Sequence, residues 1–217
     1  MLVLSYIYSI LKLLTIEKLD NMSKYIYIDD KLVNEHGHSV MMGWEKPIME
    51  KVAELLCFNS GDVLNIGFGM GIVDTYIKER NPKSHTIIED HPDVIQHIKE
   101  TGWESQANFI YTKWQEQIGK IGPFDGIYLD TWADNRIPYI NDLLDKHLKV
   151  GGIFTMWYNY GEFNAILKSL PSNYSVTYEY IINNNIIPEA KKQYENGGFY
   201  IDPSLDRITI PIITRLR

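Results

Sequence analysis

The chain has 217 residues, enough for one α/β domain, and its 45% hydrophobic and 23% charged content is ordinary for a globular protein. Its formal net charge of −7 argues against a nucleic-acid backbone as partner and favours a cationic substrate. The single cysteine, Cys57, cannot form an internal disulfide and lies in an apolar helical stretch, which indicates a reduced, packed thiol in a cytoplasmic protein.

Residues 1–14 are apolar but too short to cross a bilayer, and they lack the basic start and the cleavage site of a secretory signal. Three interpretations stay open: a helix packed on the domain, a peripheral membrane helix, or an upstream extension with Met22 as the start. The first and third are favoured. The alternation of apolar and polar residues over 24–40 predicts an extended arm outside the core. His36 and His38 stand in a turn without a third ligand, so we expect no metal site.

From residue 41 onward, helical and strand-like patterns alternate along the chain. The expected helices are 41–58, 72–80, 92–102, 137–148 (ended by Gly151 and Gly152) and 162–170, and the expected strands are 63–66, 85–88, 108–112, 124–129, 153–158, 176–182 and 208–214. Such alternation implies a mostly parallel sheet with helices on both faces. The last two strands, separated by a polar insert at 183–206, have no full crossover helix between them, which indicates one antiparallel strand near the edge.

A glycine turn, Gly67-Phe68-Gly69-Met70-Gly71, joins the first of these strands to a helix. Glu89 and Asp90 close the next strand about 20 residues on, where an acidic residue binds ribose hydroxyls in nucleotide-binding βαβ units. The pattern is neither the dinucleotide fingerprint nor a phosphate-binding P-loop. A nucleoside without a pyrophosphate therefore fits best, with S-adenosylmethionine as the leading candidate. The alternative is a turn that merely connects strand to helix.

Ligands of such sheets bind beyond the carboxyl ends of the strands, so the residues that follow each strand should share one rim. The acids expected near this rim are Glu45, Asp130 and Asp134, and the aromatics are Trp44, Trp114, Trp132, Trp157 and Tyr158. No metalloprotease, serine-hydrolase or reactive-cysteine motif is present in the sequence. Methyl transfer needs chiefly positioning and charge, and two carboxylates suit a guanidinium, whose planar fork they can bind and deprotonate.

Several stretches resemble guanidinoacetate methyltransferase and, equally, its relative the protein arginine N5-methyltransferase of fungi and plants. They are residues 40–49 (VMMGWEKPIM), 63–71 (VLNIGFGMG), 86–89 (TIIE) and 124–131 (FDGIYLDT). The similarity runs from about residue 24 to the C-terminus. It implies a Rossmann-like class I methyltransferase fold with a seven-stranded, mostly parallel sheet and one antiparallel strand in the edge region. Residues 41–217 would form the methyltransferase domain, and residues 1–40 a helix and arm that can serve as a lid.

The resemblance also implies site residues. Glu45 and Asp130 would be catalytic, gripping the guanidinium, with Asp130 as the proton acceptor. The residues expected to bind S-adenosylmethionine, or its product S-adenosylhomocysteine, are Met49, Gly67, Phe68, Gly69, Met70, Glu89, Asp90, Trp114, Gln115 and Asp130. The residues expected to bind the acceptor are Trp44, Glu45, Asp130, Trp132, Trp157 and Tyr158.

Two departures from the family pattern keep the acceptor open. The segment after the fifth strand, residues 155–162, is shorter and more aromatic than in guanidinoacetate methyltransferases, and Trp132 replaces a tyrosine. The acceptor is therefore guanidinoacetate, free arginine, a related guanidine or a peptidyl arginine. A methyltransferase for a non-guanidino amine and a catalytically silent nucleoside-binding or scaffold protein are the competing interpretations. Monomer and homodimer both stay open.

Overall fold

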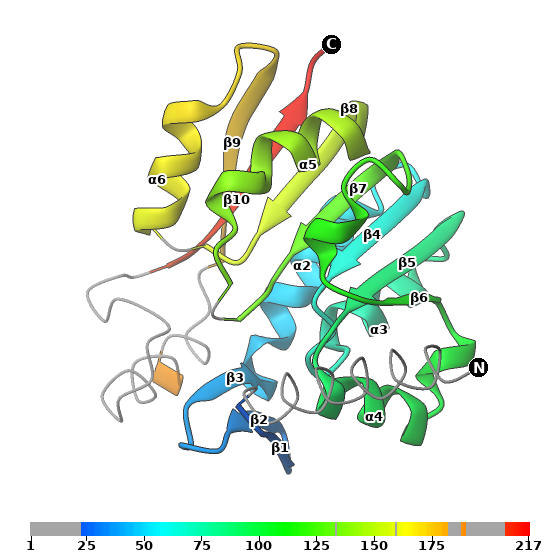
Figure 1. Ribbon diagram of the computed structural model, residues 1–217. Helices are drawn as coiled ribbons and strands as arrows, with labels where there is room; N and C mark the ends of the chain where they lie inside the picture. Colours follow the sequence, from blue (N-terminus) through cyan, green and yellow to red (C-terminus); the bar gives the residue numbers. More distant parts are fainter. Residues whose placement is uncertain (1–22, 133, 159, 182–187, 190–206) are drawn as a thin grey trace, which may run out of the picture.

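A seven-stranded sheet with helices on both faces forms the body of the protein (Figure 1). The computed structural model describes residues 23–132, 134–158, 160–181, 188–189 and 207–217. The strand order is β6-β5-β4-β7-β8-β10-β9. The strands are β4 (Asp62–Ile66), β5 (Ser84–Glu89), β6 (Asn108–Tyr111), β7 (Phe124–Leu129), β8 (Leu148–Met156), β9 (Tyr174–Ile181) and β10 (Ile208–Arg215). β10 is antiparallel to both of its neighbours, whereas β4 to β8 are parallel, which confirms the predicted fold class.

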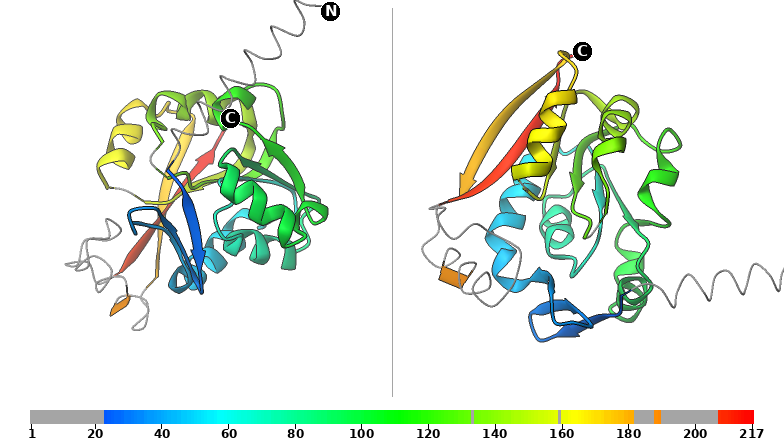
Figure 2. Two further views of the ribbon diagram at one scale, coloured as in Figure 1. Left: turned by 60° about the horizontal axis from the view of Figure 1, so that its bottom comes forward. Right: turned by 60° about the vertical axis from the view of Figure 1, so that its left-hand side comes forward.

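Alternate residues of each strand point to opposite sides of the sheet. Each face therefore has its own apolar core, which its own set of helices covers. Val63 of β4 packs in a core with α2, α3 and α4, whereas Leu64 and Ile66 pack in a second core with α5 and α6 (Figure 2). The helices are α2 (Lys46–Leu56), α3 (Ile72–Glu79), α4 (Pro92–Glu100), α5 (Ile140–His147) and α6 (Tyr160–Ser169), with short 3₁₀ helices η1 (Gly43–Glu45), η2 (Trp103–Ser105), η3 (Trp114–Gln117) and η4 (Ile137–Tyr139). Cys57 is buried at the end of α2, as expected for a packed thiol.

The segment expected to be an arm outside the core is instead a second, three-stranded antiparallel sheet. Its strands are β1 (Tyr25–Ile28), β2 (Lys31–Asn34) and β3 (Ser39–Met42). Leu32 and Met41 are 0% and 5% exposed and belong to the core that contains α2, so the prediction of a non-core arm was wrong. The alternation of apolar and polar residues is typical of strands. The surface that buries their apolar side chains comes from α2 and the rest of that core, which only the tertiary structure shows. β3 also runs across the boundary expected between residues 40 and 41.

Residues 1–22, on which the interpretations of the N-terminus and of Met22 depend, lie outside the described residues, as does most of the insert expected at 183–206.

The glycine pair expected to end the helix before the fifth strand lies inside that strand. β8 begins at Leu148 rather than at residue 153, and Gly151 and Gly152 are part of it. The pairing with β7 shifts register between Phe124 and Gly126, which is the irregularity of a bulge. Gly151 has a positive φ of 77°, a conformation that glycine adopts without strain. The two glycines therefore allow a bulged strand.

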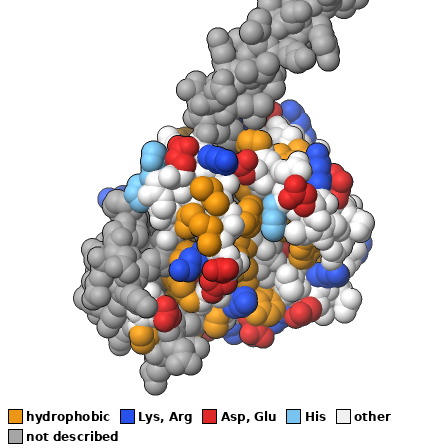
Figure 3. Space-filling model, turned by 90° about the horizontal axis from the view of Figure 1, so that it is seen from below, with side chains coloured by type: hydrophobic (Ala, Val, Ile, Leu, Met, Phe, Trp, Pro, Cys, Tyr) orange, Lys and Arg blue, Asp and Glu red, His pale blue; other side chains and the backbone are white. Residues whose placement is uncertain are grey.

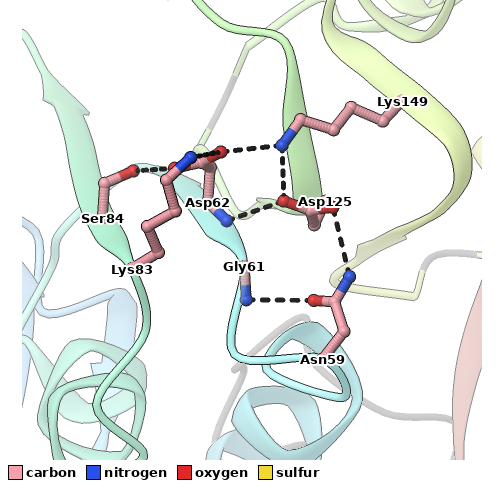
Figure 4. A network of polar contacts seen from close by, with 7 residues as sticks. All are labelled: Asn59, Gly61, Asp62, Lys83, Ser84, Asp125 and Lys149. Carbon is pink, nitrogen blue, oxygen red and sulfur yellow. Dashed lines mark hydrogen bonds and ion pairs between the residues drawn. The ribbon is translucent and has the colours of Figure 1, made fainter.

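A charged cluster holds β4, β7 and β8 together at the edge where β4 and β7 begin (Figure 4). Lys149 Nζ lies 2.7 Å from Oδ2 of Asp62 and 2.7 Å from Oδ2 of Asp125. The hydrogen bond from Lys149, supported by one from Ser84, lowers the pKa of Asp62 to about 2. For Asp125, burial acts to raise the pKa, but hydrogen bonds from Lys149 and from the Asp62 backbone leave it lowered.

We expect Lys149→Met to lower the free energy of unfolding by about 1 kcal/mol at pH 7, since two partly exposed ion pairs are lost. Both aspartates have folded-state pKa values below the unfolded value, so their contribution is present above about pH 4 and is lost as the pH falls toward the folded pKa. Urea unfolding from pH 7 down to pH 2.5 should therefore show the difference from wild type shrinking.

Lys83→Met is the matched control, because Lys83 contacts the same Asp62 but its side chain is 73% exposed. It should change stability by only a few tenths of a kcal/mol at pH 7. An equal loss in both variants, or a Lys149→Met deficit that does not depend on pH, would contradict the assignment.

Candidate active site

The glycine turn lies against the end of β7, and this contact explains its first glycine. Gly67 has φ of 94°, and a Cβ placed on it would lie 2.1 Å from the backbone oxygen of Asp130. The Asp130 N–H donates to the Ile66 carbonyl at 2.9 Å, and the Gly67 N–H donates to the Ile88 carbonyl at 2.9 Å. The turn is thus held between the ends of β5 and β7. Only glycine fits there, because any side chain would push β7 away.

A buried polar group behind the turn fixes its backbone. Asn65 Nδ2 donates to the Gly67 carbonyl at 2.9 Å and to both carboxylate oxygens of Asp74 at 2.9 Å. His85 Nε2 lies 2.9 Å from Asp74 Oδ1. Asn65 and Asp74 are both fully buried, and the sequence analysis did not identify these residues. A signal was present: an asparagine within an apolar strand and an aspartate within an apolar helix need buried partners.

Glu89 is bound by three backbone N–H groups. Its Oε2 accepts from Phe68 at 2.8 Å, and its Oε1 accepts from Asp90 at 2.9 Å and His91 at 2.8 Å. Burial raises the pKa of Glu89, and these N–H groups act in the opposite direction. A carboxylate oxygen has two lone pairs, so Oε2 retains one for a hydroxyl donor while Oε1 already accepts twice. Glu89 is therefore fixed in place and can still accept a hydrogen bond from a ligand.

A cavity of about 400 Å³ lies at the carboxyl ends of the strands. Of the residues predicted for the site, Gly67, Gly69, Glu89, Asp90, Trp114, Gln115, Asp130, Trp132, Trp157 and Tyr158 line it. Trp44, Glu45, Met49, Phe68 and Met70 do not. Figure 3 looks onto this end of the molecule, where hydrophobic side chains gather near the centre of the face among charged ones.

Three of the residues that do not line the cavity, Glu45, Met49 and Phe68, are buried. Glu45, in η1, is 1% exposed, and its Oε1 accepts a hydrogen bond from the Met42 N–H at 2.8 Å. Met49 and Phe68 are 0% exposed, and the ring of Phe68 packs edge-on against Trp103 with centroids 5.4 Å apart. Their side chains support the wall rather than form its surface.

Asp130 follows β7 and is one of the acids that line the cavity. Its Oδ2 accepts a hydrogen bond from the Tyr128 hydroxyl at 3.2 Å. Burial raises the pKa of Asp130 to about 6, although Arg136 and the Tyr128 hydroxyl favour the ionised form. Burial and the nearby charge of Asp130 raise the pKa of Glu45 well above its ordinary value. The charge of Asp130, which lines the cavity and is partly exposed, thus acts on the buried Glu45, an arrangement that favours a bound cation.

Arg136 lines the same cavity, and no motif in the sequence marks it as a site residue. It is 8% exposed, and its Nε donates to Glu162 Oε1 at 2.8 Å, with a second contact between Nη2 and Oε2. Its positive charge lowers the pKa of Asp130 and so opposes the effect of burial. Glu162 lies on α6, so this pair became visible only in the fold.

The second sheet forms one wall of the cavity. The ring of Tyr25 stacks on His91 at 3.7 Å between centroids, and the edge of Trp132 approaches Tyr25 at 6.3 Å. The hydroxyl of Tyr27 donates to the Gly69 carbonyl at 2.8 Å. The second sheet therefore contacts both the glycine turn and the segment whose backbone N–H groups bind Glu89.

No cluster of three or more metal-binding side chains occurs among the residues that the structure describes. Within the same residues, no helix has the length and apolarity needed to cross a bilayer.

Comparison with known proteins agrees with the resemblance found in the sequence. The family model for guanidinoacetate N-methyltransferase matches residues 17–193. Protein arginine N-methyltransferase 2 of Candida glabrata is 34% identical over 214 residues, covering 84% of this chain and 51% of the relative. The protein of the same name from Saccharomyces cerevisiae is 32% identical over 211 residues, covering 82% and 50%. The chain thus spans about half the length of the curated relatives it matches.

Solved structures show the same fold at low sequence identity. Spermidine synthase from Thermotoga maritima has a TM-score of 0.58 at 16% identity, covering 89% of this chain and 72% of that one. Precorrin-6y C5,15-methyltransferase from Geobacter metallireducens has a TM-score of 0.57 at 12% identity, covering 81% and 89%. The fold is the Rossmann-like fold of class I methyltransferases, and the match over residues 17–193 shows that the chain belongs to the guanidinoacetate N-methyltransferase family.

Proposed function

We propose that this protein is an S-adenosylmethionine-dependent N-methyltransferase that acts on a guanidino group. The observation that carries the proposal is a pair of interacting acids next to the glycine turn: Asp130 lines the cavity, and its charge acts on Glu45, which is buried nearby. Family membership and relatives named protein arginine N-methyltransferase 2 support it. With its reduced thiol, the protein would act in the cytoplasm.

The residues of the turn and of the next strand end fit the cofactor. Glu89 Oε2 has a lone pair for a ribose hydroxyl, and Gly67 and Gly69 present backbone without side chains to the cavity. Trp114 and Gln115 would flank the adenine, while Met49, Phe68 and Met70 would support the methionine moiety from behind. When bound, S-adenosylmethionine supplies an electrophilic methyl group.

Asp130 binds the guanidinium and takes its proton. A guanidinium is a poor nucleophile because its pKa exceeds about 12, so one nitrogen must be oriented and must lose a proton as it is methylated. With a pKa of about 6, Asp130 is mostly ionised at neutral pH and can accept that proton. Glu45 adds a second acid behind the wall, and a bound guanidinium would favour its ionised form.

The acceptor that best fits the mouth of the cavity is an arginine side chain of a protein. Trp132, which lines the cavity, is 38% exposed, and Tyr139, which is 41% exposed, packs edge-on against the cavity residue Trp114 with ring centroids 5.8 Å apart, so exposed aromatic surface lies at and near the cavity. Trp157 and Tyr158 line the interior and would contact the alkyl part of the arginine, with Trp44 packed behind. Guanidinoacetate is the second candidate, because the family model carries that name.

Product analysis tests the proposal directly. The protein is incubated with methyl-labelled S-adenosylmethionine and, separately, with arginine peptides, guanidinoacetate, free arginine and a simple alkyl amine, followed by mass spectrometry. We expect label on a guanidino nitrogen. Label on the simple amine alone would support the amine-methyltransferase alternative, and the absence of S-adenosylhomocysteine binding in calorimetry would leave only a scaffold role.

Asp130→Asn should reduce kcat by about 100-fold or more, since the amide cannot accept the proton. The affinity for S-adenosylhomocysteine, measured by calorimetry, should stay within about twofold, because the Asp130 backbone contacts to the turn are kept. Asp142→Asn is the control: it removes a charge from an exposed pair on α5 and should leave both values unchanged. Near-wild-type turnover in Asp130→Asn would refute the role of this residue.

The pH dependence of kcat/KM should have an acid limb set by Asp130 in the free enzyme. The carboxylate is ionised above its pKa of about 6, so the rate should fall tenfold per pH unit below that value and level off above it. Tyr128→Phe removes a hydrogen bond that lowers this pKa, so its acid limb should move to higher pH. A limb that stays in place in Tyr128→Phe would argue against Asp130 as the titrating group.

A further inference from the structure

One carboxylate, that of Asp134, joins two chain segments that both line the cavity. Its Oδ2 accepts the indole N–H of Trp114 at 2.6 Å. Gln115 Nε2 lies 3.0 Å from its Oδ1 and 2.9 Å from its Oδ2. The Thr131 hydroxyl is 3.4 Å from Oδ2. All four residues line the cavity.

The sheet order makes this contact informative. Trp114 and Gln115 open η3 just after β6, whereas Thr131 and Asp134 follow β7. β5 and β4 lie between these strands in the sheet, so the contact joins segments that follow two strands that are not neighbours. The segment after β7 starts at Asp130, which also lines the cavity. The bridge therefore connects the segment that carries this acid with the segment beyond β6.

We propose that Asp134 is a positioning residue that holds Trp114 and Gln115 in place for the adenosyl group of the cofactor. This inference rests on the proposed function, because η3 is the expected adenine side of the cavity. Oδ2 of Asp134 is already contacted by three donors, and Oδ1 accepts only from Gln115; we assign Asp134 no contact with the acceptor.

The chemistry of the donors explains why removal of the carboxylate would matter. Trp114 is 4% exposed and its indole has a single N–H, which is costly to leave without an acceptor. A hydrogen bond to an ionised carboxylate is stronger than a neutral one. Without Asp134, the indole would have to turn toward another acceptor, and the surface offered to a flat ligand would change.

Calorimetry with S-adenosylhomocysteine tests the inference on the full chain. We expect Asp134→Ala to weaken binding about tenfold, as for loss of hydrogen bonds to a charged group, and Asp134→Asn to have an intermediate effect. Trp114→Phe keeps a ring but removes the N–H and should weaken binding about threefold. The double variant Trp114→Phe/Asp134→Ala should bind no more weakly than Asp134→Ala, because both changes remove the same hydrogen bond.

Controls separate positioning from a loss of folding. Asp142→Ala, on the exposed surface of α5, should bind like wild type. At saturating cofactor, Asp134→Asn should keep kcat within about fivefold while the KM for S-adenosylmethionine rises, a split that general destabilisation would not give. If Asp134→Ala does not fold, Asp134→Asn and Trp114→Phe still decide the question.

The outcomes are distinct. If wild type does not bind S-adenosylhomocysteine, the proposed function itself fails. If wild type binds and both Asp134→Asn and Trp114→Phe bind equally well, only the role of Asp134 is refuted. Strictly additive losses in the double variant would also refute it, because the two side chains would then act independently.

Discussion

The close approach of β7 to the glycine turn is the contact on which the site depends. The backbone oxygen of Asp130 occupies the space that a side chain on Gly67 would need, and the Asp130 N–H is bonded to the end of β4. Asp130 is therefore positioned by contacts of its backbone, and these contacts do not depend on its side chain. Cofactor turn and acid are two parts of one junction between adjacent parallel strands.

The charge distribution around this junction is balanced by residues from separate elements. Burial disfavours ionisation of Asp130 and Glu45, whereas Arg136 opposes that effect at Asp130. Arg136 is in turn held by Glu162 from α6. A cation bound beside the two acids would lower the pKa of both and favour their ionised forms.

The second sheet supplies part of the cavity wall through Tyr25, Leu32, Val40 and Met41. Tyr25 stacks on His91, and the Tyr27 hydroxyl donates to the Gly69 carbonyl. A change in the position of β1 would therefore alter the contacts of the glycine turn. The hydrogen bond between Asp134 and Trp114 likewise joins two segments at the cavity, η3 and the segment after β7. The site is thus assembled from strand ends and held by side chains that come from outside the sheet.

The sequence by itself determined the fold class, because alternating apolar strands and amphipathic helices admit few arrangements of a parallel sheet. It also indicated the turn at Gly67 and the acids Glu89 and Asp130, because residues at strand ends must share one rim. Only the tertiary structure showed that Glu45 is buried away from the cavity lining, that residues 25–42 join the core, that Arg136 lines the cavity, and that Asp134 bonds to Trp114 and Gln115. Those features depend on contacts between segments far apart in the chain, and local periodicity carries no information about such pairings.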